Sequence, residues 1–170
     1  MAGKYKGFII ALLLSLVLDQ GSKIWARDTL KAKYPAVTTV VRGYFELRYS
    51  ENTGSAFGLL RGVPGAKYVF FVVGLGALVV VASYLKRAAP GQRRLGAELG
   101  LLAGGALGNI IDRVAFGRVT DFVVWKLGAH EWPTFNIADA ALVVGIVGLL
   151  IDLRPDPQDQ APATAKKHRA

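Results

Sequence analysis

Residues 119–140, VTDFVVWKLGAHEWPTFNIADA, contain two aspartates in apolar surroundings. Asp121 follows Val-Thr, and Asp139 lies one turn inside a long apolar run that begins at Asn136. A carboxylate beside a membrane-length segment is costly to keep charged, so it usually has a function. Two such carboxylates that meet can share one proton and divide acid and base roles between them. The stretch therefore predicts an aspartyl protease embedded in a membrane, with Asp121 and Asp139 as its catalytic pair.

The composition is too apolar for an ordinary soluble domain. The chain has 170 residues, of which 52% are hydrophobic, and its mean hydropathy is +0.36. These values predict one compact polytopic unit over residues 1–153. No cysteine occurs, which excludes disulfides and thiolate chemistry, and only His130 and His168 are histidines. We therefore expect neither a cysteine metal site nor a histidine-rich one.

Four apolar segments are predicted to span the bilayer: residues 7–25, 67–85, 95–111 and 136–153. No small-residue cleavage pattern follows the first segment, so we expect it to be retained. Residues 86–94 carry four positive charges and no acid, which predicts a cytoplasmic loop. Four crossings would place both termini in the cytoplasm, with residues 154–170 as a disordered tail. The net charge of +9 is therefore better explained by orientation of the chain in an anionic membrane than by nucleic-acid binding.

The region between the first two apolar segments predicts a small extracytoplasmic sheet over residues 36–60. Residues 37–41 and 44–49 are rich in β-branched and aromatic side chains, and Gly43 separates them. Asn52-Thr-Gly then indicates a tight turn. This turn is either an ordinary hairpin end or a loop that lays backbone donors along an extended substrate. The fold class is thus an α-helical polytopic membrane protein with four helices and this sheet.

Polar residues at the helix ends suggest partners for the aspartates. Asp19 and Lys23 lie four residues apart and share a helix face, so they either mark the helix exit or form an ion pair tied to the site. Asp112 rivals Asp121 as the partner of Asp139, although beside Arg113 a structural ion pair suits it better. Arg113 itself needs a carboxylate or a lipid phosphate nearby.

Antiparallel packing would bring the end of the third segment and the start of the fourth to one membrane face, and Asp121 and Asp139 flank that connection. The third segment also has a glycine at every fourth position, which lets a neighbouring helix approach closely: Gly96, Gly100, Gly104 and Gly108. Three alternatives remain. They are a proton-coupled transporter, a membrane scaffold that uses this glycine stripe, and a serine–lysine peptidase using Ser22 and Lys23.

Several segments resemble the lipoprotein signal peptidase family, also called signal peptidase II. They are DQGSK at residues 19–23, NTGSAF at 52–57, GGALGNIIDR at 104–113 with VTDF at 119–122, and FNIAD at 135–139. Each motif alone is weakly diagnostic, but their order and their placement at helix ends are specific.

The resemblance implies an aspartic endopeptidase of the bacterial inner membrane. It would remove the signal peptide of diacylglyceryl-modified prolipoproteins just before the lipidated cysteine, among membrane phospholipids and near the outer face. Globomycin, which blocks the family's site, is expected to bind. The resemblance implies no cofactor. The catalytic aspartates carry over onto Asp121 and Asp139. The supporting or substrate-contacting positions carry over onto Asp19, Lys23, Asn52, Gly54, Asn109, Asp112, Arg113, Asn136 and Ala138.

Overall fold

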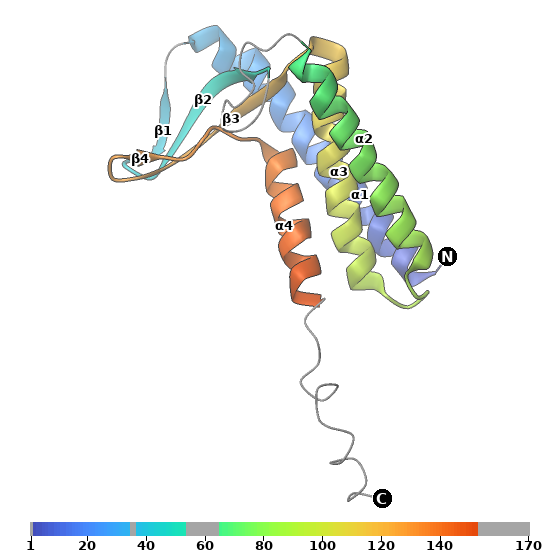
Figure 1. Cartoon of the computed structure of the whole chain (residues 1–170). Helices are drawn as coiled ribbons and strands as arrows, with labels where there is room; N and C mark the ends of the chain where they lie inside the picture. The colour runs from blue at the N-terminus through green and yellow to red at the C-terminus, as the bar shows by residue number, and fades with distance from the viewer. Residues whose placement is uncertain (1, 35–36, 54–64, 153–170) are drawn as a thin grey trace, which may run out of the picture.

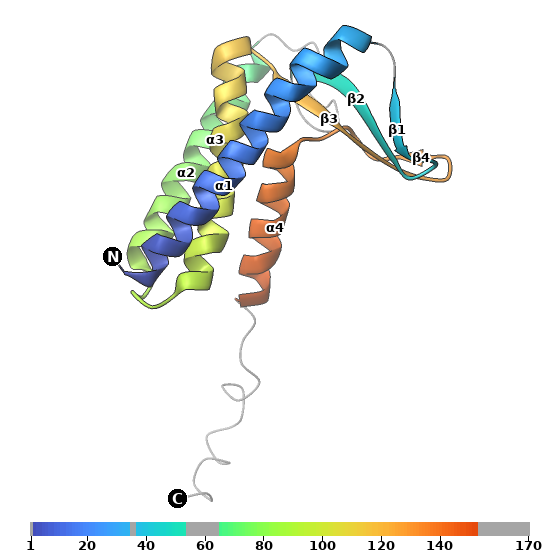
Figure 2. The ribbon, with the colours of Figure 1, turned by 180° about the vertical axis from the view of Figure 1, so that it is seen from behind.

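A computed structural model describes residues 2–34, 37–53 and 65–152. Four helices form a bundle, and a small sheet projects sideways from one end of it (Figure 1). The helices are α1 (Gly3–Trp25), α2 (Ala66–Arg87), α3 (Arg93–Phe116) and α4 (Ile137–Asp152), and two short helical turns, η1 (Ala26–Leu30) and η2 (Lys31–Lys33), extend α1. The four helices overlap the four predicted apolar segments. The N-terminus and the last turn of α4 lie at the end of the bundle away from the sheet (Figures 1 and 2).

Helix α3 is the centre of the bundle, because α1, α2 and α4 all pack against it. The glycine stripe explains how closely α1 approaches. A methyl group added at Gly96 or Gly100 would collide with the carbonyl oxygen of Lys4 or Phe8, respectively. At Gly104 and Gly108 it would meet the side chains of Ser15 and Asp19. The predicted close approach of a helix to this stripe is therefore confirmed. Because α1 already occupies the stripe, it is not a free surface for a scaffold partner.

Within the described residues, three helical stretches are long and apolar enough to cross a membrane: Gly3–Lys33, Tyr68–Arg87 and Arg93–Phe116. Helix α4 has 16 residues, which is shorter than the ~20 residues that a bilayer core requires. Four complete crossings thus remain a prediction. The helical membrane architecture with a small antiparallel sheet is as expected.

The sheet has the order β1-β2-β3-β4 and is antiparallel throughout. Strands β1 (Thr38–Val41) and β2 (Phe45–Asn52) match the two predicted strands. The prediction that the whole sheet lies between the first two helices is wrong, because β3 (Val119–Leu127) and β4 (His130–Glu131) follow α3. The first six residues of β3 are all buried, on both faces. The strand therefore lacks the alternation that identifies a strand with one exposed face.

A small apolar core joins this sheet to the end of α1. Its buried members are Ala26, Leu30, Tyr49, Phe122 and Val123. The Trp25 ring packs edge-on against Phe122, with 6.2 Å between the ring centroids. These contacts fix β3 beside the C-terminal ends of α1 and α3, and this position determines where Asp121 lies.

Candidate active site

Asp121 lies on β3 opposite Ser50 of β2, and the same register brings Asn52 to its side. The Asn52 amide donates to Asp121 Oδ2 at 3.1 Å. The Asn136 amide donates to the other oxygen, Oδ1, at 2.7 Å. With an exposed fraction of 2%, the carboxyl group is removed from solvent. The sheet therefore delivers Asp121 into the interior at the end of the helical bundle.

Asp139 belongs to a reciprocal cap at the start of α4. Its backbone N–H donates to Asn136 Oδ1 at 3.0 Å, and the backbone N–H of Asn136 donates to Asp139 Oδ2 at 3.2 Å. The three-residue spacing of this asparagine and aspartate is that of a capping box, with Asp in the place of the usual Glu or Gln. The remaining oxygen, Oδ1, accepts a bond of 2.8 Å from the Asn109 amide. The cap fixes the carboxylate at the positive end of the helix dipole.

Asn136 connects the two aspartates. Its side-chain oxygen caps Asp139, while its side-chain nitrogen reaches Asp121 and also Asn109 Oδ1, the latter at 3.2 Å. Asn136 is fully buried. Asp121 and Asp139 are thus brought together from different elements, β3 and α4, through a single amide.

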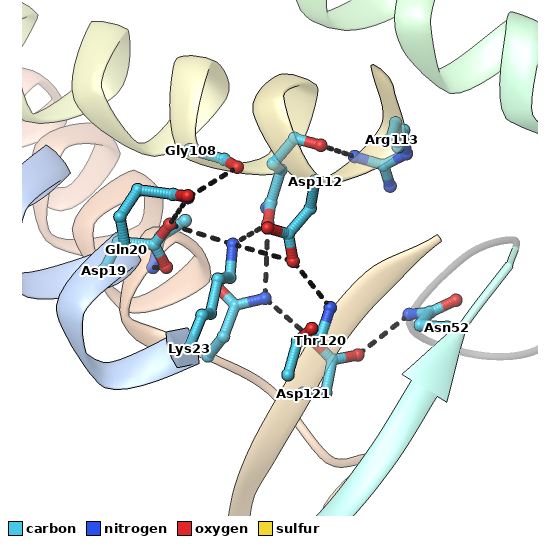
Figure 3. Close-up of polar contacts among 12 residues, drawn as sticks. Asp19, Gln20, Lys23, Asn52, Gly108, Asp112, Arg113, Thr120 and Asp121 are labelled. Atoms are coloured by element: carbon cyan, nitrogen blue, oxygen red, sulfur yellow. Dashed lines mark hydrogen bonds and ion pairs between the residues drawn. The ribbon is translucent and has the colours of Figure 1, made fainter. Parts of the chain in front are cut away.

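Lys23 organises the polar network beneath this pair (Figure 3). Its ammonium group lies 2.8 Å from Asp19 Oδ2 and donates to Asn109 Oδ1 at 3.0 Å. Because the oxygen of the Asn109 amide faces this cation, its NH₂ group faces Asp139. Asp19 Oδ1 in turn accepts from the backbone N–H of Ala138 at 2.9 Å. Asp19 and Lys23 therefore form the ion pair that ties α1 to the site, which is one of the two interpretations left open by their spacing.

Asp112 is also buried, but its partners differ from those expected. Its oxygens accept from the Thr120 N–H at 2.8 Å and from the Arg27 guanidinium at 3.3 Å, and Lys23 lies 3.8 Å away (Figure 3). Asp112 therefore forms the expected structural ion pair, but with Arg27 and Lys23 instead of Arg113. Consecutive helical residues such as Asp112 and Arg113 point in different directions. Arg27 was not identified from the sequence as a partner of Asp112, although Arg27 lies four residues after Lys23 and so shares its helix face. Thr120, the other missed partner, gives no comparable signal.

Arg113 lines a cavity of about 270 Å³ beside the aspartates. Its guanidinium donates to the Asn109 carbonyl at 3.2 Å and lies 5.4 Å from the centre of the Phe70 ring. Within the described residues it forms no ion pair with a carboxylate. The polar lining of this cavity is Asn52, Asn109, Arg113, Asp121 and Asp139, and the remainder is largely apolar.

Two further predicted positions remain, Ala138 and Gly54. Ala138 is fully buried and packs towards the Gly105 and Gly108 backbone of α3, so it helps α4 to approach α3 closely. Gly54 lies outside the described residues. The serine–lysine peptidase alternative requires the Ser22 and Lys23 side chains to contact each other. Instead, the Ser22 hydroxyl donates to the Asp19 carbonyl at 2.9 Å, and the Lys23 ammonium contacts Asp19 and Asn109.

The surroundings of Asp121 favour its protonated form. Burial is the largest cause and the nearby Asp139 carboxylate the next, and together they raise the pKa of Asp121 from 3.8 to about 7. The hydrogen bonds from Asn52 and Asn136 and the charge of Lys23 act in the opposite direction. A carboxyl group with such a pKa can donate a proton near neutral pH.

The chain closely resembles several known proteins. A model of the signal peptidase (SPase) II family matches residues 10–154. A lipoprotein signal peptidase of Xanthomonas euvesicatoria is 40% identical over 147 residues, which is 84% of each chain. One of Geobacter metallireducens is 38% identical over 163 residues, covering 95% of this chain and 98% of the relative. A solved structure described as a bacterial membrane enzyme superposes with a TM-score of 0.78 at 29% identity, over 90% of this chain and 92% of that one.

The fold, the apolar helices and these neighbours together define a membrane-embedded peptidase. More specifically, the chain belongs to the lipoprotein signal peptidase family, signal peptidase II.

Proposed function

We propose that this protein is an aspartyl endopeptidase of the bacterial inner membrane. It removes the signal peptide from diacylglyceryl-modified prolipoproteins by cleaving just before the lipidated cysteine. The observation that carries the proposal is the pair of carboxyl groups of Asp121, which is buried, and Asp139, which is partly buried. They are linked through Asn136 beside a cavity at one end of the bundle. Family membership supports the substrate class.

The two carboxyl groups have surroundings that suit different roles. Asp121 holds the shared proton, since burial and the neighbouring Asp139 raise its pKa to about 7. Asp139 is the base, because it lies at the positive N-terminal end of α4 and accepts a bond from the backbone N–H of Asn136. One protonated and one ionised carboxyl group is the state that acid–base hydrolysis requires.

The hydrolysis then proceeds in two steps. A water molecule attacks the scissile carbonyl carbon and gives a proton to Asp139, while Asp121 gives its proton to the carbonyl oxygen. The product is a neutral tetrahedral diol. In the second step Asp139 passes its proton to the amide nitrogen as the carbon–nitrogen bond breaks. A diol hydroxyl returns a proton to Asp121, so both groups regain their starting states.

The cavity beside the aspartates suits a substrate that arrives from within the bilayer. Phe70, Val73 and Leu142 provide apolar lining from α2 and α4, while Arg113 contributes a cation without a carboxylate partner among the described residues. An apolar peptide or an acyl chain would contact the first group, and a carbonyl or phosphate oxygen would suit the guanidinium. Globomycin is proposed to compete for this cavity. In the proposed orientation both termini are cytoplasmic and the aspartates lie near the outer face, among membrane phospholipids.

A cleavage assay with purified full-length protein tests the proposal. We expect Asp121→Asn and Asp139→Asn each to reduce cleavage of a diacylglyceryl-modified prolipoprotein by at least about 10³-fold, because neither asparagine can take up a proton. The exposed Asp28→Asn serves as the matched control and should cleave normally.

Two further reactions complete this assay. An unlipidated substrate should remain uncut, and globomycin should inhibit the native protein. Cleavage retained by either of the two site variants would refute the catalytic pair. Equal cleavage of the unlipidated peptide would refute the substrate assignment.

A further inference from the structure

A groove runs between α1 and α2 at the end of the bundle away from the aspartates. Helices α1 and α2 both pack on α3 but scarcely contact each other. The glycine stripe draws α1 close to α3, whereas α2 meets α3 through larger side chains such as Val81 and Leu85. The difference leaves a trough of about 390 Å³. Its lining is Tyr5, Phe8, Leu12, Leu78, Val81, Ala82, Leu85, Lys86, Ala103 and Leu107.

The groove is apolar along its length and cationic at one end. Lys86 lies at that end and is exposed, with the half-exposed Tyr5 ring on the opposite wall. Lys4 holds this end in place, because its buried ammonium group donates to the backbone carbonyls of Lys86, at 3.2 Å, and Ala88. Residues 2–18 and 84–97 contain several basic side chains and no acidic one. Glu98 and Asp152 also lie at this end, where both pair with Arg94, but the basic residues outnumber these two acids. The groove therefore ends in a positive electrostatic field.

We propose that this groove binds an anionic phospholipid, with an acyl chain along α1 and α2 and the phosphate group at Lys86. The depth supports this occupant. From Leu78 to Lys86 the groove follows nine residues of α2, a rise of about 12 Å along the helix. That is close to one leaflet, half of a hydrocarbon core of ~30 Å. A helix of another membrane protein could fill the apolar part of the groove, but it would not supply a phosphate to Lys86, as a phospholipid does.

The volume and the chemistry of the lining are consistent with this ligand. About 390 Å³ lies within the range of small-molecule sites. The walls consist of aliphatic and aromatic side chains that a lipid tail can contact, and the cation is placed where a headgroup would lie. An anionic headgroup is favoured by about fivefold for each basic residue near it. The site lies at the opposite end of the bundle from the aspartates and does not depend on the proposed activity.

The test uses the full-length protein in detergent with added phosphatidylglycerol or phosphatidylcholine of identical acyl chains. Native mass spectrometry measures the retained lipid, and thermal unfolding measures the melting temperature. We expect the protein to retain phosphatidylglycerol at least about fivefold better and to melt at a higher temperature with it. Lys86→Gln should remove most of this preference, and Lys86→Arg should keep it. Arg93→Gln, at an exposed cation outside the groove, should also keep it.

A second pair of variants tests the acyl-chain part of the site. Ala82→Phe fills the groove and should abolish lipid retention, whereas Val80→Phe, on an exposed face of α2 outside the groove, should not. Equal retention of the two lipids, full retention by Ala82→Phe, or equal loss in Val80→Phe would overturn the proposal. If Ala82→Phe does not fold, the Lys86 variants decide it. Asp121→Asn should bind lipid like the native protein, so this result is independent of the catalytic proposal.

Discussion

Among single residues, Asp121 links the stability of the fold to pH. Its pKa is about 7 in the folded protein, compared with an ordinary value of 3.8. Between these two pH values the folded state binds a proton that the unfolded state does not. The free energy of unfolding therefore falls as pH rises through this window, by up to about 4 kcal/mol. Below pH ~4 both states are protonated and this destabilisation is absent.

We predict that Asp121→Asn removes this pH dependence, because an amide does not titrate. Thermal unfolding at pH 5 and pH 8 would measure this effect. From pH 5 to pH 8, the melting temperature of the variant should rise by several degrees relative to that of the native protein. Asp28→Asn should follow the native curve. Cleavage by the native protein should decline above pH ~7, where Asp121 loses the proton that it donates. Parallel unfolding curves for the native protein and Asp121→Asn would contradict the assigned pKa.

The residue-level contacts show which partners a sequence can predict. The pairing of Asp19 with Lys23 follows from a four-residue spacing on one helix. The bond from Lys23 to Asn109 joins positions 86 residues apart and has no local signal. The same is true of the contact between Asn136 and Asp121, which depends on the position of β3 relative to α4. The polar residues of the site could therefore be named from their types and places, but their individual partners could not.

At the level of helices, the glycine stripe of α3 supports a sharp comparison. Gly100 lies so close to the carbonyl of Phe8 that an added methyl group does not fit. The same methyl group would lie 3.0 Å from the Ala11 side chain. Gly76, in the middle of α2, has open space around the same position. In a helix interior, alanine is favoured over glycine by about 1 kcal/mol.

We predict opposite effects for the same substitution at these two positions. Gly76→Ala should raise the melting temperature slightly, because it only improves helix propensity. Gly100→Ala should lower the free energy of unfolding by about 2 kcal/mol or more, since α1 must move away from α3. The experiment is thermal unfolding of both variants in one detergent. A stabilising or neutral Gly100→Ala would contradict the close packing of α1 on the stripe.

Strand β3 is the element that the sequence did not identify. Its first six residues, VTDFVV, are buried on both faces, so apolar and polar residues do not alternate along them. Such a run beside an apolar helix is indistinguishable by pattern from an interfacial loop. Strands β1 and β2 had the clearer signals of β-branched residues and a separating glycine. Their pairing with β3 depends on a contact between distant parts of the chain, which no local pattern specifies.

The whole molecule has chemically different ends. The α2–α3 connection carries four basic residues within residues 86–94 and lies away from the sheet (Figure 1). The sheet end carries exposed aromatic side chains of the kind found at a membrane interface, including Trp125 and Trp132. The aspartates lie near this second end. The positive-inside rule therefore predicts that Asp121 and Asp139 lie at the outer face of the membrane.

Reporter fusions measure this orientation directly. A reporter that is active only in the cytoplasm should be active when fused after Gln92, which immediately precedes α3. A reporter that is active only outside the cytoplasm should be active when fused after Ala129, in the turn between β3 and β4. Exchanging the basic residues of the 86–94 segment for glutamine should weaken the preference for this orientation, because positive charges favour the cytoplasmic side. Activity of both reporters in the opposite compartments would place the aspartates at the cytoplasmic face. A lipoprotein signal peptide that has crossed the membrane would then be out of their reach.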